Sequence, residues 1–334
     1  MLNIQIFTFL VQLLWVLNSA QQPEQAPAGP GGSDYTFGEV LISDYSTEPD
    51  GFWLYEPIAP RPDSAHLVVL IHGYGAINPM IYGGWIKHLV GKGNIVVFPR
   101  YQKNLTNPAP SDFPKNVAQA IKDALTVLAE EDHVKPYPGK MSLAGHSYGG
   151  VIAANLGVNY DTLGLPTPDA IMLCSPGSGP FKGAVLDDYT GLSPDLKLLV
   201  MVSDRDHVVG DRFGKKVFNT ATQVRQRNLI RQFSDRHGEP RIAAGHNECQ
   251  SWDEQFDGGI YNFTSNKARK TVRTDALDYY GYWKLFDALM DCGHSGENCH
   301  VALGGTPEQK SLGQWSDGVE IRALEIQLPE HGDN

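Results

Sequence analysis

One serine of this chain lies where its hydroxyl could act as a nucleophile. Around Ser147 the sequence reads Met141-Ser-Leu-Ala-Gly-His-Ser-Tyr-Gly-Gly150, so a short apolar run meets Gly-x-Ser-x-Gly and a helix-like segment follows. Small residues around a serine permit the tight strand-to-helix turn that lifts its hydroxyl above a sheet edge. A glycine-rich turn with a capping serine has the same pattern, so the pattern alone does not establish catalysis.

A reactive serine requires a general base and a carboxylate that orients the base. The segment Ser203-Asp-Arg-Asp-His-Val-Val209 follows a predicted strand and contains two carboxylates. We predict Asp206 as the orienting acid, because Asp-x-Val-Val resembles a loop that enters the next helix. Asp204 is the alternative, although it is also suited to capping the turn.

Two histidines are candidates for the base. His246 follows the small residues Ala243-Ala244-Gly245 and opens a polar loop, as expected of a segment that packs beneath a nucleophile. His237 lies closer to the preceding predicted strand and remains the alternative. We predict that His246 is the base.

Backbone N–H groups are expected to stabilise the oxyanion that develops during acyl transfer. One candidate is the N–H of Tyr148, directly after the serine. The other is the N–H of Tyr74, in the run His72-Gly73-Tyr74-Gly75 that follows an apolar strand-like segment. The glycines allow the main chain to bend there, and His72 is expected to shape the loop.

Strand-like and helix-like segments alternate through the chain. Eight strand candidates are short, mostly apolar runs at residues 37–42, 51–55, 67–71, 95–98, 141–144, 170–173, 197–202 and 228–233. Helical spacing of apolar residues or helix-favouring composition marks residues 80–90, 114–131, 151–156 and 275–290. Solid apolar runs are typical of parallel strands that are covered on both faces. The sequence therefore predicts an α/β fold with a mostly parallel, doubly wound sheet.

The segments around Ser147, Tyr74, Asp206 and His246 together resemble the α/β-hydrolase superfamily. Within it, the chain is similar to secreted serine esterases that lack a cap domain, the grouping of cutinases, polyester hydrolases, chlorophyllases and dienelactone hydrolases. The resemblance extends over about residues 50–290, and the C-terminal tail lies outside it. It implies an α/β-hydrolase fold, with a mostly parallel eight-stranded sheet, helices on both faces and no large cap.

The residues and the resemblance predict a serine hydrolase that cleaves carboxylic esters through an acyl-enzyme intermediate, with no cofactor. A peptidase or an acyltransferase would use the same residues. The alternative from another class is a catalytically inactive hydrolase fold that serves as a binding protein. The expected partner is a small or polymeric ester, whose acyl and alcohol groups the sequence leaves open. It also leaves the oligomeric state open.

Charge and the N-terminal residues restrict the remaining function classes. A net charge of −11 argues against nucleic acid as a partner. Residues 1–20 combine an apolar run with small residues at its end and are predicted to be a signal peptide. This predicts secretion, or a periplasmic location in a bacterial host, with no stable membrane insertion after leader removal. Residues 21–33 are predicted to be a flexible linker, and residues 34–334 a single domain with a C-terminal extension at 292–334.

Cysteine usage is consistent with export. Cys292 and Cys299 enclose a turn-rich loop and are predicted to form a local disulfide. A zinc site that adds His294 and His300 to these cysteines fits no closed four-ligand spacing, so we expect no metal.

Two further features depend on the compartment. Asn104 and Asn262 each begin an Asn-x-Thr sequon, which becomes a glycosylation site in a secreted chain of a glycosylating host. Cys174 lies in a predicted buried strand and Cys249 in a loop, and each could be a free thiol.

Overall fold

The computed structural model describes residues 19–106 and 108–329, so most of the predicted signal peptide lies outside the described residues. Strand β4 (Leu67–Ile71) shows how the apolar runs build the sheet, because all of its residues are buried. The side chains of Val68 and Leu70 belong to the core on one face, and that of Val69 belongs to the core on the other. Successive side chains of a strand point to opposite faces, so an unbroken apolar run requires a cover on both.

The main sheet of the described chain has nine strands. Across the sheet they follow the order β1 (Val40–Asp44), β2 (Phe52–Pro57), β5 (Ile95–Pro99), β4, β7 (Lys140–His146), β8 (Thr167–Cys174), β9 (Lys197–Ser203), β10 (Gln226–Gln232) and β11 (Glu325–Gln327). The strands from β5 to β10 are parallel to one another, whereas β1, β2 and β11 pair antiparallel at the two edges. A separate small sheet pairs β3 (Ser64–Ala65) with β6 (Lys135–Pro136).

The predicted number of eight strands is wrong, and the sheet is mixed at its edges. Each of the eight predicted segments overlaps a strand of the main sheet, from β1 to β10. The additional strand is β11, whose sequence Glu-Ile-Gln has a single apolar residue. Its register against β10, with Ile326 opposite Ile230, is set by pairing with a distant strand. A local hydrophobic pattern therefore could not predict it.

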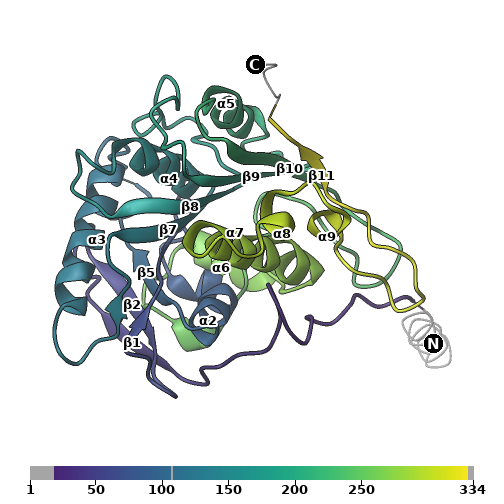
Figure 1. Cartoon of the computed structure of the whole chain (residues 1–334), viewed down its shortest axis with the longest axis horizontal. Coiled ribbons are helices and arrows are strands. Elements are labelled where there is room, and N and C mark those ends of the chain that lie inside the picture. Colours follow the sequence, from purple (N-terminus) through teal and green to yellow (C-terminus); the bar gives the residue numbers. More distant parts are fainter. Residues whose placement is uncertain (1–18, 107, 330–334) are drawn as a thin grey trace, which may run out of the picture.

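Helices cover both faces of the sheet (Figure 1). On one side lie α3 (Phe113–Leu128), α4 (Tyr148–Asn159) and α5 (Arg212–Thr220), and on the other lie α2 (Gly83–Gly91), α6 (Phe263–Thr271) and α7 (Lys284–His294). Short helical segments complete the chain as η1 (Pro79–Tyr82), η2 (Glu254–Phe256), the π-helical η3 (Asp278–Trp283), α8 (Cys299–Leu303) and α9 (Pro307–Lys310). In the described part of the chain, no helix is both long and apolar enough to cross a membrane.

The segment predicted as a flexible linker lies against the body of the protein and is attached by hydrogen bonds. The Gln22 side chain donates to the carbonyl oxygen of Pro240 and accepts the N–H of Ala276. Further along, the N–H of Gly31 donates to the carboxylate of Asp287 on α7 at 2.8 Å. The composition of this segment predicts its lack of regular secondary structure, but these partners are far away in the sequence.

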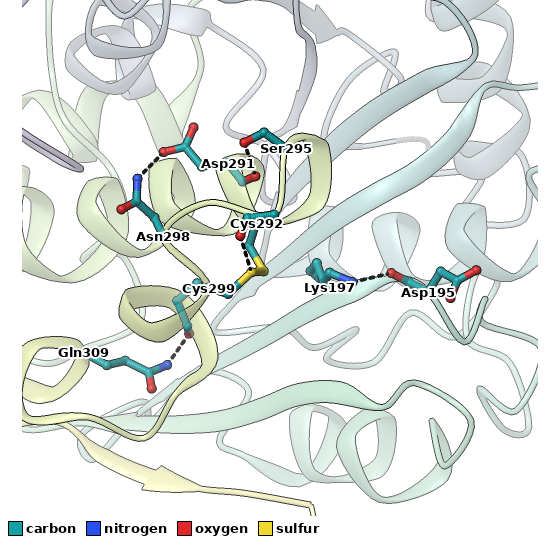
Figure 2. Close-up of a disulfide and its surroundings, with 10 residues drawn as sticks. Asp195, Lys197, Asp291, Cys292, Ser295, Asn298, Cys299 and Gln309 are labelled. Carbon is teal, nitrogen blue, oxygen red and sulfur yellow. Dashed lines mark hydrogen bonds between the residues drawn. A yellow bond between two sulfur atoms is a disulfide. The ribbon is translucent and has the colours of Figure 1, made fainter.

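The C-terminal residues are tied to α7 by a disulfide (Figure 2). Cys292 and Cys299 form this bond, as predicted, and join the last turn of α7 to the start of α8. Beside it, the amide of Asn298 donates to the carboxylate of Asp291 at 2.7 Å. Among the described cysteines, Cys174 and Cys249 are buried free thiols that form no disulfide.

We expect removal of this disulfide to lower the free energy of unfolding by about 2 kcal/mol, because the closed loop is short and the unfolded chain loses little entropy by closing it. The measurement is urea unfolding of the double variant Cys292→Ala, Cys299→Ala. Adding a reductant should destabilise the wild-type protein by the same amount and leave the double variant unchanged. Equal stability of the two oxidised proteins would contradict the expectation.

Candidate active site

The turn between β7 and α4 holds Ser147 in a strained backbone conformation. Its φ and ψ are 54° and −118°, a region that non-glycine residues seldom occupy. The neighbouring glycines are required by close packing. A β-carbon on Gly149 would lie 2.1 Å from the carbonyl oxygen of Ile71, and one on Gly145 would lie 2.4 Å from that of Gly149. The sequence pattern at this turn therefore has a steric cause.

A continuous hydrogen-bonded chain connects the predicted acid, base and nucleophile. His246 Nε2 lies 2.9 Å from Ser147 Oγ, and His246 Nδ1 lies 2.8 Å from Asp206 Oδ2. The Asp206 side chain is fully buried, and its Oδ1 accepts the N–H groups of Val208 and Val209. Burial raises the pKa of Asp206, but hydrogen bonds from His246 and these N–H groups outweigh it and lower the pKa overall. The ionised carboxylate holds the proton on Nδ1 and leaves the Nε2 lone pair toward the serine.

The alternative residues lie elsewhere. Asp204 accepts the backbone N–H of Ser234 at 3.3 Å. His237 Nε2 lies 2.7 Å from Asp317 Oδ2, in an exposed ion pair with the C-terminal segment. The structure therefore brings Ser147 together with the preferred acid and base, and does not bring the alternatives to it.

The long segment between β10 and His246 forms a hairpin. Asp235 and Ile242 exchange two backbone hydrogen bonds, of 3.0 and 2.9 Å, and His237 lies in the turn between them. After the hairpin, the carbonyl oxygen of Ala244 accepts the N–H of Arg205 at 3.1 Å. This last bond joins the loop that carries Asp206 to the loop that carries His246.

The predicted oxyanion donors lie on the same pocket as the serine. The N–H of Tyr148 is at the first position of α4, where a helix has no internal acceptor for it. The residue after Tyr74 is held by two hydrogen bonds. The N–H of Gly75 donates to the Gln102 side chain, and its carbonyl oxygen accepts from the Asn262 side chain. No described residue accepts the Tyr74 N–H. Both N–H groups are therefore free to donate to a substrate oxygen.

His146, directly before the nucleophile, connects three loops, and the sequence analysis did not single it out. The N–H of Gly73 donates to the Tyr82 hydroxyl at 3.0 Å, and this hydroxyl lies 2.7 Å from His146 Nδ1. His146 Nε2 lies 2.9 Å from the carbonyl oxygen of His246. Burial, together with the nearby His246, lowers the pKa of His146 to about 3, so its ring is neutral. A neutral ring accepts from Tyr82 at one nitrogen and donates to His246 at the other.

A pocket of about 300 Å³ surrounds the serine. Its apolar lining includes Tyr74, Pro180, Phe181, Val208, Val209 and Phe263. The rings of Tyr74 and Phe181 stack at 4.7 Å and form one wall. At the rim, Phe263 is 77% exposed and Val208 is 67% exposed. The pocket therefore offers apolar surface to a substrate beside the serine.

Three carboxyl groups lie near one another and near the loop that carries His246. Glu248 Oε1 accepts the N–H of Gly245 at 3.1 Å. Burial, with a smaller contribution from the Asp275 charge, raises the pKa of Glu248 to about 7, and burial raises the pKa of Asp275 to about 6. Burial also raises the pKa of Asp278 well above its usual range. Because burial raises the pKa of all three carboxyl groups, their protonation depends on how tightly this region is packed.

The zinc site considered from the sequence is incompatible with the disulfide, because Cys292 and Cys299 are bonded to each other. In the described part of the chain, one group of potential metal ligands comes together, formed by His66, Asp169 and His294. It lies outside the pocket that surrounds the serine.

We expect Glu248→Gln to remove a contribution to the free energy of unfolding that is lost as the pH rises. In the folded protein Glu248 keeps its proton up to about pH 7, whereas the unfolded chain releases it near pH 4.5. Between these values Glu248 binds its proton more tightly in the folded state than in the unfolded chain, so its contribution to stability decreases as the pH rises. Between pH 5 and pH 8 the variant should gain about 2.5 kcal/mol in stability relative to the wild type in urea unfolding. Parallel losses in the two proteins would contradict this.

Comparison with known proteins supports the grouping that the motifs predict. Residues 55–187 match the family described as Chlorophyllase. Among curated proteins, no match to the chain was found. The matched segment is less than half of the chain; it contains Ser147 and both candidate oxyanion donors, and it ends before Asp206 and His246. Over this segment the chain is similar to chlorophyllases, a family of the α/β-hydrolase superfamily, and the predicted resemblance is thereby confirmed.

Proposed function

We propose that this protein is a secreted serine esterase that hydrolyses carboxylic esters. One observation carries the proposal, namely the hydrogen-bonded chain from Asp206 through His246 to Ser147 at the wall of an apolar pocket. Similarity to a hydrolase family over residues 55–187 supports the reaction class. Secretion rests on the apolar N-terminal run and on the disulfide.

In the first step, the Ser147 hydroxyl attacks the ester carbonyl carbon while His246 Nε2 takes the hydroxyl proton. The carbonyl oxygen becomes an oxyanion, and the N–H groups of Tyr74 and Tyr148 donate to it. Asp206 holds the imidazole in place and stabilises the imidazolium. The tetrahedral intermediate then expels the alcohol, which takes its proton from His246, and an acyl-enzyme remains.

In the second step, water replaces the alcohol. His246 removes a proton from the water, which attacks the acyl carbon, and the acid leaves as Ser147 recovers its proton. The burial of Asp206 and the hydrogen bond of His146 to the His246 backbone keep the base in position through both steps. Preorganised groups of this kind lower the barrier because they do not rearrange during the reaction.

The apolar lining of the pocket favours the binding of an ester that has apolar substituents. Stacked Tyr74 and Phe181 form a wall, and the exposed ring of Phe263 extends the apolar surface beyond the cavity. Lys267 also lines the pocket. Burial of a substituent against such surface stabilises the complex by about 25 cal/mol per Å² of apolar area.

A peptidase, an acyltransferase and an inactive binding protein are the competing functions, and no observation favours any of them over the esterase. A fluorophosphonate probe separates the inactive protein from the three enzymes, because covalent labelling requires an activated serine. Two rate comparisons separate the enzymes. Ester against amide hydrolysis identifies the bond that is cleaved, and hydrolysis against transfer to an added alcohol identifies the acceptor of the acyl group.

We expect Ser147→Ala to reduce kcat for a p-nitrophenyl ester by at least about 10³-fold, because the acyl-enzyme cannot form. Ser193→Ala is the matched control, since Ser193 lies outside the pocket, and it should retain wild-type activity. Circular dichroism and the Tm should show that both variants are folded. A Ser147→Ala protein with wild-type kcat would refute the proposal.

Substitution of the two candidate histidines separates the base from the alternative. His246→Ala should lower kcat by at least about 10³-fold, because the serine loses its proton acceptor. His237→Ala should stay within about twofold of the wild type, since its partner Asp317 lies in the exposed C-terminal segment and exposed ion pairs contribute little. The reverse result would assign the base to His237.

A further inference from the structure

A second group of serine, histidine and aspartate lies near the other end of the sheet. Ser147 follows the carboxyl end of β7, whereas Ser142 lies near the amino end of the same strand. His66 directly precedes β4, and Asp169 is the third residue of β8. Because β4, β7 and β8 are parallel neighbours, their amino ends lie side by side and bring these residues together.

The hydrogen bonds of this group leave two buried atoms without a partner. Ser142 Oγ donates to Asp169 Oδ1 at 2.8 Å, and His66 Nε2 lies 2.7 Å from Ser142 Oγ. Because the hydroxyl has one proton, which goes to Asp169, the ring must donate its Nε2–H to Ser142. His66 Nδ1 then carries a lone pair. Within the described chain, neither this atom nor Asp169 Oδ2 has a hydrogen-bond partner, although both are buried.

This group is not arranged for nucleophilic catalysis. Ser142 is completely buried and lines none of the pockets beside it. Its hydroxyl proton points to the carboxylate, so His66 cannot act as its base. The serine instead connects the two other side chains and fixes which of their atoms remain free.

His294 completes a set of metal ligands. It is the last residue of α7, and its ring centroid lies 5.3 Å from that of His66 in an edge-on arrangement. Gly293 lets α7 approach the strand, because a β-carbon there would lie 2.8 Å from the carbonyl oxygen of Asp169. One ligand atom from each of His66, Asp169 and His294 lies within 4.8 Å of the others.

We propose that His66, Asp169 and His294 bind a divalent transition-metal ion, with Zn²⁺ as the representative, at the edge of the sheet remote from Ser147. Imidazole nitrogen and carboxylate oxygen are common ligands of such ions. The bond from His66 to Ser142 supplies the outer hydrogen bond that a ligating histidine normally makes through its second ring nitrogen. Three protein ligands leave at least one coordination position for water.

The adjoining cavity favours a cation. It has a volume of about 400 Å³ and is lined by both histidines together with Asp34, Asp287 and Asp291. Lys92 also lines it and forms an ion pair with Asp34. Among the buried atoms of the described chain that lack a partner is Asp287 Oδ1. Asp287 Oδ2 also lies 2.9 Å from His88 Nε2, and Asp291 accepts from the Asn298 amide. The three carboxyl groups in the cavity lining outnumber its one lysine, which favours a cation there.

Binding requires a small movement of His294. Ligands of a tetrahedral zinc ion lie roughly 3.3 Å apart, from bond lengths near 2.0–2.1 Å. His294 is exposed and at a helix end, so its side chain is the one that is free to move. The ring of Tyr137 stacks on that of His294 at 4.9 Å, so the imidazole moves most easily by sliding along the tyrosine ring.

The test is calorimetric titration of the metal-free full chain with ZnCl₂, with the Tm measured in parallel. We expect one binding site and a Tm that rises with the metal concentration, since the ion binds the folded state. His294→Ala should weaken Zn²⁺ binding at least tenfold. His300→Ala is the matched control, an exposed histidine paired with Glu308, and should bind as the wild type does.

A milder variant tests the role of the serine. Ser142→Ala removes the outer hydrogen bond while keeping all three ligands, and should weaken binding by about tenfold. Failure of the wild-type protein to bind Zn²⁺, or equal affinity in His294→Ala, would overturn the proposal. Equal weakening in His300→Ala would assign the binding to surface histidines. Because the readout is binding, the result is independent of ester hydrolysis at Ser147.

Discussion

Burial of His146 in its neutral form organises the active end of this protein. Its ring accepts a hydrogen bond from Tyr82, which also fixes the N–H of Gly73, and lies in hydrogen-bond distance of the His246 backbone. Three loops that are far apart in the sequence thus share one imidazole. A protonated ring could not accept from Tyr82, so desolvation, which lowers the pKa of His146, also maintains the geometry of the site.

The same region stores backbone strain, and the surrounding core supports it. Ser147 has a positive φ, and the adjacent glycines allow α4 to contact the end of β4. Such a conformation persists when packing on all sides determines it. Here the parallel strands are buried on both faces, and helices cover each of them. The rigid sheet therefore determines where the serine hydroxyl points, while the loops after β9 and β10 bring Asp206 and His246 to it.

The two ends of the sheet carry different chemistry. Near the carboxyl ends, the hydroxyl of Ser147 faces the imidazole of His246 and an open apolar pocket. Near the amino ends, the hydroxyl of Ser142 is buried and donates to a carboxylate. The residue types are the same, so the direction of the hydroxyl proton and its access to solvent distinguish the two groups. The absence of a side chain at Gly293 lets the end of α7 lie close to the second group.

Local pattern was sufficient for every element with a long apolar run and for the turn at Ser147, because strand burial and steric crowding act within a few residues. It also predicted the set Ser147, Asp206 and His246, but it could not separate Asp206 from Asp204 or His246 from His237. That choice depends on hydrogen bonds between residues that are 40 and 99 positions apart in the sequence. Strand β11, the attached N-terminal segment, the role of His146 and the group around His66 likewise exist only through pairing of distant segments. Eight of the nine strands of the main sheet, the turn at Ser147 and the candidate residues follow from local sequence. Which candidates meet depends on the folded chain, because hydrogen bonds form between residues that are close in space.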